Sequence, residues 1–140
     1  MVITPINNGI VIDHITAGKG MRLYEILKLA ELDCAVAIIM NVDSPKMGKK
    51  DIIKIDRVID LDFDAVGYID PDVTINIISD GKLQKRKHLE LPETITGVIK
   101  CANPRCITST EQELPQVFRL TDREKHTYRC IYCESKAKRR

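Results

Sequence analysis

Four cysteines near the C-terminus constrain this chain more than any other feature. Cys101 and Cys106 form a C-x4-C pair, and Cys130 and Cys133 form a C-x2-C pair further along the chain. Each pair can reach one ion from a tight turn, and soft thiolates favour zinc over magnesium or calcium. We therefore expect one structural Zn²⁺, because four thiolates leave no open coordination position for catalysis.

Two other interpretations of these cysteines stay open. Two structural disulfides would leave Cys34 as an unpaired fifth cysteine, and the sequence shows no secretory segment. An iron–sulfur centre would use the same thiolates. Cys34 itself precedes an apolar run and is expected to be a small buried side chain. Since no apolar run approaches the length of a membrane span, we expect a reduced, cytoplasmic protein.

Charge divides the 140 residues into two parts of different character. From Gly97 onward the chain has 10 Lys or Arg and 5 Asp or Glu, a net charge of +5, whereas the preceding part has a net charge of −3. The Pro-containing stretch at residues 91–94 lies near this change and is a plausible domain boundary. We expect one domain over residues 1–93 and a second, metal-stabilised domain over residues 94–140, too small to build an adequate core alone.

The first part alternates strand and helix patterns. Strands are expected at residues 10–15, 35–42, 51–55, 73–78 and 82–88, with helices at 21–32 and within 57–67. The run at 35–42 is apolar enough for a central strand. This order predicts an α+β fold, in which both helices cover one face of a five-stranded antiparallel sheet and leave the other face free. The second part offers only short β segments, at 97–100, 117–120 and 127–129, and predicts a small all-β domain.

Polar residues within the expected strands are candidates for a ligand site. Asp13 and His14 interrupt an aliphatic strand, and neighbours on a strand point to opposite faces, although a structural histidine explains the pair as well. Lys50 and Lys54 share one strand face about 13 Å apart, a spacing that suits an elongated polyanion or an ordinary solvated edge.

A third cluster of cations lies at the end of the last strand of the first part. Residues 85–88 read Lys-Arg-Lys-His in an otherwise acidic domain. They suggest an anion site or a charged edge strand that prevents aggregation. The sequence contains no glycine-rich phosphate loop, so any nucleotide would be held by separate cations.

Five sequence blocks together resemble the regulatory chain of aspartate carbamoyltransferase. They are Gly9-x-Val-Ile-Asp-His-Ile15, Met47-Gly-Lys-Lys-Asp-Ile-Ile-Lys-Ile55, Thr74-Ile-Asn76, Leu91-Pro-Glu93, and the two cysteine pairs. The resemblance implies a non-catalytic subunit with an N-terminal allosteric domain that binds CTP or ATP and a C-terminal zinc domain that docks on the catalytic chain. It also implies a homodimer through the allosteric domains and feedback control of pyrimidine biosynthesis, with CTP inhibiting and ATP activating.

The resemblance also assigns roles to individual residues. Asp13 would meet the ribose, His14 would lie near the phosphates, and Lys50 and Lys54 fall on the nucleotide-site lysines. The base pocket would be formed by Ile6, Val11, Asn76, Ile78, Leu83 and the backbone of Gly81.

The chain departs from the family pattern at several positions around this site. Arg86 replaces a phosphate-binding lysine, and Gly81 replaces a larger residue. Asn7 and Asn8 replace basic residues. These differences bear on which nucleotide is preferred and on the sign of the response.

The main alternative function is a nucleic-acid-binding zinc ribbon that uses the basic tail at residues 136–140. Such a protein would need a basic stripe interleaved with aromatic residues, and aromatic residues make up only 4% of the chain. We therefore expect no nucleic-acid or membrane partner. We also expect no enzymatic activity, because no pairing of a nucleophile with a base can be made out.

Overall fold

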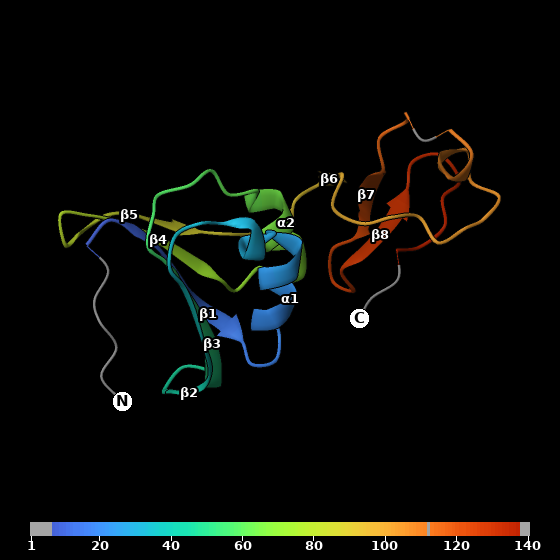
Figure 1. Cartoon of the computed structure of the whole chain (residues 1–140). Helices are drawn as coiled ribbons and strands as arrows, with labels where there is room; N and C mark the ends of the chain where they lie inside the picture. Colours follow the sequence, from blue (N-terminus) through green and yellow to red (C-terminus); the bar gives the residue numbers. More distant parts are fainter. Residues whose placement is uncertain (1–6, 112, 138–140) are drawn as a thin grey trace. The chain divides into compact units, whose positions relative to one another are not determined.

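The chain folds into two compact units, residues 1–90 and 91–140 (Figure 1). The computed structural model describes residues 7–111 and 113–137. Among the described residues, no helix is long and apolar enough to cross a membrane.

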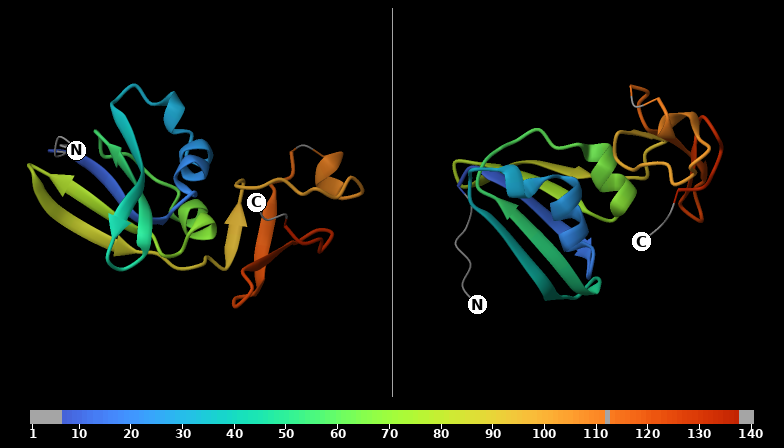
Figure 2. Two further views of the ribbon diagram at one scale, coloured as in Figure 1. Left: turned by 90° about the horizontal axis from the view of Figure 1, so that it is seen from below. Right: turned by 45° about the vertical axis from the view of Figure 1, so that its right-hand side comes forward.

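The first unit is built on a five-stranded antiparallel sheet with the strand order β2-β3-β1-β4-β5. Its strands are β1 (Gly9–Thr16), β2 (Val36–Ser44), β3 (Gly48–Ile55), β4 (Thr74–Ser79) and β5 (Lys82–His88). Figure 2 shows the two helices of this unit, α1 (Gly20–Ile26) and α2 (Phe63–Ile69), on the same face of the sheet. The expected α+β architecture is confirmed.

The core of the first unit lies between the two helices and the face of the sheet that they cover. Alternate residues of the three inner strands, such as Ile12, Ile53 and Ile75, are fully buried there together with Leu23 and Val66 of the helices. The residues between them in sequence project from the opposite, uncovered face, because side chains alternate along a strand. We call this uncovered side the open face.

The expectation that the apolar run at 35–42 forms a central strand is wrong, because β2 is an edge strand. Val36 and Ile38 pack against the core, but Ala37 is exposed and Met40 is 54% exposed. An apolar run fixes which residues favour burial, whereas the place of a strand in the sheet depends on pairing with distant segments.

The helices also differ from the expected ranges. The helix expected at 21–32 ends at Ile26, because Lys28 adopts a left-handed backbone conformation with φ 54°. A short 3-10 turn, η1 (Leu29–Glu31), follows and buries Leu29 to 2% exposure. The helix expected within 57–67 begins later, where the Asp62 carboxylate accepts a hydrogen bond from the Ala65 N–H.

The second unit contains a three-stranded antiparallel sheet, β6-β7-β8. The strands are β6 (Thr94–Thr96), β7 (Val117–Asp122) and β8 (Thr127–Cys130), with a 3-10 turn η2 (Ile107–Ser109). Ile95, Phe118 and Tyr128 are its large buried side chains. The strand expected at 97–100 is not formed, because Gly97, at φ 72°, turns the chain away and donates to the Gln116 carbonyl. With so small an apolar core, this unit needs a further source of stability.

Candidate functional site

The second unit brings its four paired cysteines to one point. Their sulfur atoms all lie within 4.8 Å of one another. The Sγ atoms of Cys101 and Cys133 are 3.5 Å apart, and those of Cys106 and Cys130 are 3.7 Å apart. These separations are far beyond a disulfide bond and close to the ~3.8 Å edge of a tetrahedron of thiolates around zinc. The residues present therefore fit a structural metal.

Local hydrogen bonds explain why each cysteine pair forms a tight turn. The Asn103 carbonyl accepts from the Cys106 N–H at 3.1 Å, while the Asn103 Oδ1 accepts from the Arg105 N–H at 3.0 Å. In the second pair, the Cys130 carbonyl accepts from the Glu134 N–H at 2.8 Å. Hydrogen bonds from the backbone and from the Asn103 side chain thus define the geometry of the ligand turns.

The four thiols have unequal acidities because their surroundings differ. Burial raises the pKa of Cys101 to about 12 and also raises the pKa of Cys130. Hydrogen bonds from Thr108 lower the pKa of Cys106, and hydrogen bonds from Ser135 lower the pKa of Cys133 to about 6. Four like charges this close oppose one another, so only a bound cation favours all four thiolates at once.

A row of side chains crosses the open face of the first unit. Val11 of β1 pairs with Lys54 of β3 on one side and with Asn76 of β4 on the other, and Asn76 pairs in turn with Arg86 of β5. Directly paired residues lie on the same face of a sheet. The Arg86 Nε donates to the Asn76 Oδ1 at 3.0 Å. The row therefore has a cation at each end and an apolar and an amide side chain between them.

Asp13 and Lys50 form an ion pair beside this row. The Lys50 Nζ lies 2.9 Å from the Asp13 Oδ1, which also accepts from the His14 N–H at 2.6 Å. Burial raises the pKa of Asp13, but these hydrogen bonds and the nearby positive charge outweigh it, so its pKa lies below the usual value. Both side chains are largely buried, with 22% and 16% exposure for Asp13 and Lys50.

His14 lies in a β-bulge, so the simple alternation expected for Asp13 and His14 does not apply. The register of β1 against β3 shifts between Ile12 and Ile15, and His14 has a φ of 59°. Its Nδ1 atom is buried and has no hydrogen-bond partner among the described residues. Strained backbone and an unsatisfied buried nitrogen are both features typical of functional sites.

The other proposed base-pocket residues lie at the β4–β5 hairpin. Ile78 pairs with Leu83, which is 50% exposed. Asp80 and Gly81, with φ of 52° and 74°, form the turn between them. The Gly81 N–H donates to the Asn7 carbonyl at 2.9 Å, which holds the N-terminal segment against this turn. Ile6 lies outside the described residues.

The cations of residues 85–88 do not all share one face. Arg86 is on the open face, but Lys85 pairs with Ile77, whose side chain packs against the core. The Lys87 Nζ lies 3.9 Å from the centre of the Phe63 ring, also on the helix-bearing face. The structure thus brings Arg86 alone of these three to the row with Lys54.

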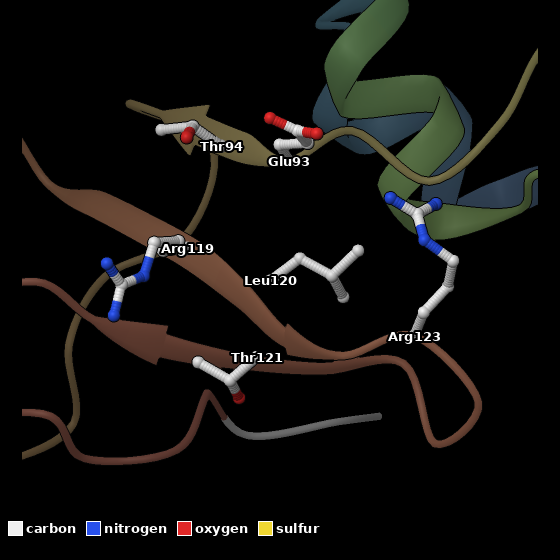
Figure 3. A pocket seen from close by; sticks show the side chains of 6 residues that line it. All are labelled: Glu93, Thr94, Arg119, Leu120, Thr121 and Arg123. Carbon is white, nitrogen blue, oxygen red and sulfur yellow. The ribbon is translucent and has the colours of Figure 1, made fainter.

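One hollow of the second unit contains none of the metal-binding or nucleotide-binding residues expected from the sequence. It has a volume of about 310 Å³ and is lined by residues of β6, β7 and their flanks (Figure 3). Glu93, Arg119 and Arg123 are exposed at its rim. The spacing of these residues in the sequence gives no signal of a shared hollow, because the hollow forms only when β6 pairs with β7.

Comparisons with known proteins agree with both units. Residues 1–90 match the family model of the aspartate carbamoyltransferase regulatory chain, allosteric domain, and residues 93–140 match that of the same chain's metal binding domain.

Whole-chain relatives extend this match. Aspartate carbamoyltransferase regulatory chains of Clostridium tetani and Clostridium botulinum are 53% and 51% identical, covering 96% of this chain and 94% and 92% of their own lengths. The regulatory chain of Bifidobacterium longum is 44% identical over 99% of both chains. The chain therefore belongs to the family of aspartate carbamoyltransferase regulatory chains, the non-catalytic allosteric subunits of that enzyme.

Proposed function

We propose that the open face of the first unit binds CTP and ATP, and that the chain converts this binding into feedback control of pyrimidine biosynthesis. The observation that supports this most directly is the row from Lys54 through Val11 and Asn76 to Arg86. Cations bind phosphates, an apolar side chain packs on a base, and an amide offers hydrogen bonds to base edges. One row thus offers the chemical groups that a nucleoside triphosphate requires.

Each polar group near the row has a role suited to its surroundings. The Asp13 carboxylate, ionised in the folded state, can accept hydrogen bonds from ribose hydroxyls. Lys50 neutralises Asp13 and lies where it can also contact the ribose or phosphates. Lys54, Arg86 and His14 provide the remaining positive or hydrogen-bonding groups for the phosphates. Ile78, Leu83 and the Gly81 backbone then line the base pocket, together with Ile6.

The second unit is proposed to hold one structural Zn²⁺ and to dock on the catalytic chain. Ile107, Ile131 and Tyr132 lie beside the cysteines in sequence and are 51%, 48% and 37% exposed. Exposed apolar side chains on rigid turns suit a protein interface. The first unit would pair with a second copy of the chain, and the assembly would work in the cytoplasm.

Allosteric control requires that each nucleotide has a different affinity for two conformations of the assembly. Coupling free energies are typically about 1–3 kcal/mol. CTP and ATP share ribose and triphosphate, so only contacts with the base distinguish them. The hairpin that contains Gly81 and Leu83 is therefore where the preference and the sign of the response are determined.

Calorimetric titration of the zinc-loaded chain with CTP and ATP, beside Lys54→Ala, tests the nucleotide site. Loss of one charged hydrogen bond to phosphate costs about 1.5–3 kcal/mol, which weakens binding roughly 10- to 150-fold. Lys85→Ala is the matched control, because Lys85 is an exposed cation of the same sheet that lies outside the row. Equal loss in both variants, or no binding to the unmodified chain, would refute the site.

Assembly with the catalytic chain tests the proposed role of the second unit. Cys106→Ala removes one thiolate ligand and should abolish co-assembly in size-exclusion chromatography, while CTP still binds the first unit. Stable co-assembly of this variant would rule out the docking role.

The nucleic-acid-binding alternative is not favoured, since the family match covers both units. It predicts RNA or DNA binding that weakens steeply with salt, which gel-shift titration at two salt concentrations would detect.

A further inference from the structure

A hydroxyl group contacts one of the metal-binding sulfurs. The Thr108 Oγ1 donates a hydrogen bond to the Cys106 Sγ at 3.1 Å, and Thr108 is only 4% exposed. Thr108 is the middle residue of η2, whose backbone begins at Cys106 with the Ser109 N–H donating to the Cys106 carbonyl at 2.9 Å. This tight turn directs the side chain of Thr108 inward while Ile107 stays exposed.

Neighbouring hydroxyls of the same segment have other partners. The Ser109 hydroxyl donates to the Asn103 carbonyl at 3.0 Å, and the Thr110 hydroxyl donates to the Ile107 carbonyl at 3.1 Å. Both of these residues are exposed. Of three consecutive hydroxyl side chains, Thr108 is thus the one that is buried and directed at a sulfur.

Buried thiolates need such donors. Four thiolates around one divalent ion leave a net charge of about −2, and Cys106 is only 2% exposed. A buried charge is tolerated when hydrogen bonds disperse it, and outer donors also fix the orientation of a ligand side chain. The contact from Thr108 meets both needs at Cys106.

We propose that Thr108 is a positioning residue of the metal centre, whose hydroxyl holds the Cys106 thiolate and raises the affinity for the metal. This inference rests on the proposed zinc site and adds to it a residue that does not touch the ion. It assigns a role to the Cys-x-Thr spacing that follows the second cysteine of the first pair.

The second cysteine pair repeats the spacing in the sequence, because Ser135 follows Cys133 as Thr108 follows Cys106. Each pair therefore ends in a cysteine with a hydroxyl residue two positions later.

Zinc competition against a chromogenic chelator, measured on the full chain, tests the proposal. Thr108→Val keeps the shape of the side chain and removes the donor, and should weaken zinc binding roughly 10- to 100-fold. Thr108→Ser should restore binding, because it keeps the hydroxyl. Thr110→Val is the control, since its hydroxyl contacts a backbone carbonyl, and it should bind as the unmodified chain does.

Cobalt substitution gives a second measurement that a purely structural role would not change. A hydrogen bond lowers the energy of the sulfur lone pairs, so its loss in Thr108→Val should move the sulfur-to-cobalt charge-transfer band to lower energy. If Thr108→Val fails to fold even with excess metal, Thr108→Ala is compared with Thr108→Ser instead, and weaker binding by Thr108→Ala alone is expected.

The possible results distinguish failure of the proposed role of Thr108 from failure of the proposed metal site. If the unmodified chain binds no zinc, the proposed centre fails and Thr108 has no such role. If the unmodified chain binds zinc and Thr108→Val matches it in affinity and band position, the inference about Thr108 is wrong and the centre stands. Equal weakening in Thr108→Ser and Thr108→Val would assign the effect to the lost or altered methyl packing and also overturn the inference.

Discussion

Asp51 is a buried carboxylate whose replacement by Asn should destabilise the first unit severely. It lies on β3 with 0% exposure, and its two oxygens accept three backbone hydrogen bonds. The Gly18 and Gly20 N–H groups donate to Oδ2 at 3.1 and 3.0 Å, and the Asn41 N–H donates to Oδ1 at 3.1 Å. One side chain thus fastens both the segment that begins α1 and an irregular part of β2.

The expected magnitude follows from these three bonds. An amide has a single acceptor oxygen, so in Asp51→Asn the oxygen can face the two glycines while the NH₂ group faces the Asn41 N–H. That lost bond to a charged acceptor costs about 1.5–3 kcal/mol, and the two remaining bonds each weaken by about 1 kcal/mol when the acceptor becomes neutral. The sum, about 3.5–5 kcal/mol, is a large share of a typical stability of about 5–15 kcal/mol.

Urea denaturation with amide hydrogen exchange of β1 and β3 as the readout measures the effect in the first unit alone. Asp72→Asn is the control, because it makes the same chemical change at an exposed position. The reasoning is refuted if the two variants differ by less than about 0.5 kcal/mol, which is the usual range of surface substitutions.

Three further predictions concern the same two units. Gly20→Ala should destabilise the first unit, because the new Cβ would lie 2.8 Å from the Asp51 Oδ2. Ala favours helices over Gly by about 1 kcal/mol, so urea denaturation that shows a stabilised variant would contradict this expectation. Chelation of the metal should remove amide protection from β7 and β8 while β1 and β3 keep theirs, since the second unit has little core of its own; equal loss in both units would contradict this. The lowered pKa of Asp13 stabilises the fold above the unfolded-state pKa of about 4, and this contribution should be lost as pH falls through the lower, folded-state value. In Lys50→Met the loss of unfolding free energy on acidification should be smaller than in the unmodified chain. An unchanged pH profile of stability would show that the Asp13–Lys50 ion pair does not cause this loss.

Local sequence patterns were enough to predict the elements of the first unit and their class. The alternation of Ile53, Lys54 and Ile55 in β3 is visible in the sequence because side chains of a strand alternate between faces, whereas the buried Asp51 and the apolar Ile52 depart from this pattern. The close spacing within each cysteine pair likewise predicts a shared ion from turn geometry alone. These features depend on residues that are near one another in the chain.

Features that depend on distant segments were not predictable in this way. The edge position of β2 results from which strand pairs with β3, and the local helical spacing gives no signal of the left-handed backbone at Lys28 that separates α1 from the buried Leu29. In the proposed nucleotide site, the hydrogen bond from Arg86 to Asn76 depends on the register of β4 against β5. Alternation along the strand separates Arg86 from Lys85 and Lys87, but only the register shows which of them faces the row.

The bulges beside β3 connect the fold to the proposed site. Both neighbours of β3 are irregular at the same level, β1 between Ile12 and Ile15 and β2 between Ile39 and Val42. Each bulge contains a residue with positive φ, His14 at 59° and Asn41 at 60°.

Each of these strained residues has its N–H bound by a carboxylate, His14 by Asp13 and Asn41 by Asp51. Bulges redirect side chains and are common beside functional sites, and strain persists only where surrounding contacts enforce it. Lys50 stands next to Asp51 in β3 and is paired with Asp13, so both carboxylates act at the level where Lys50 projects. The strain on either side of β3 therefore lies at the level of the Asp13–Lys50 ion pair, where we propose that the nucleotide binds.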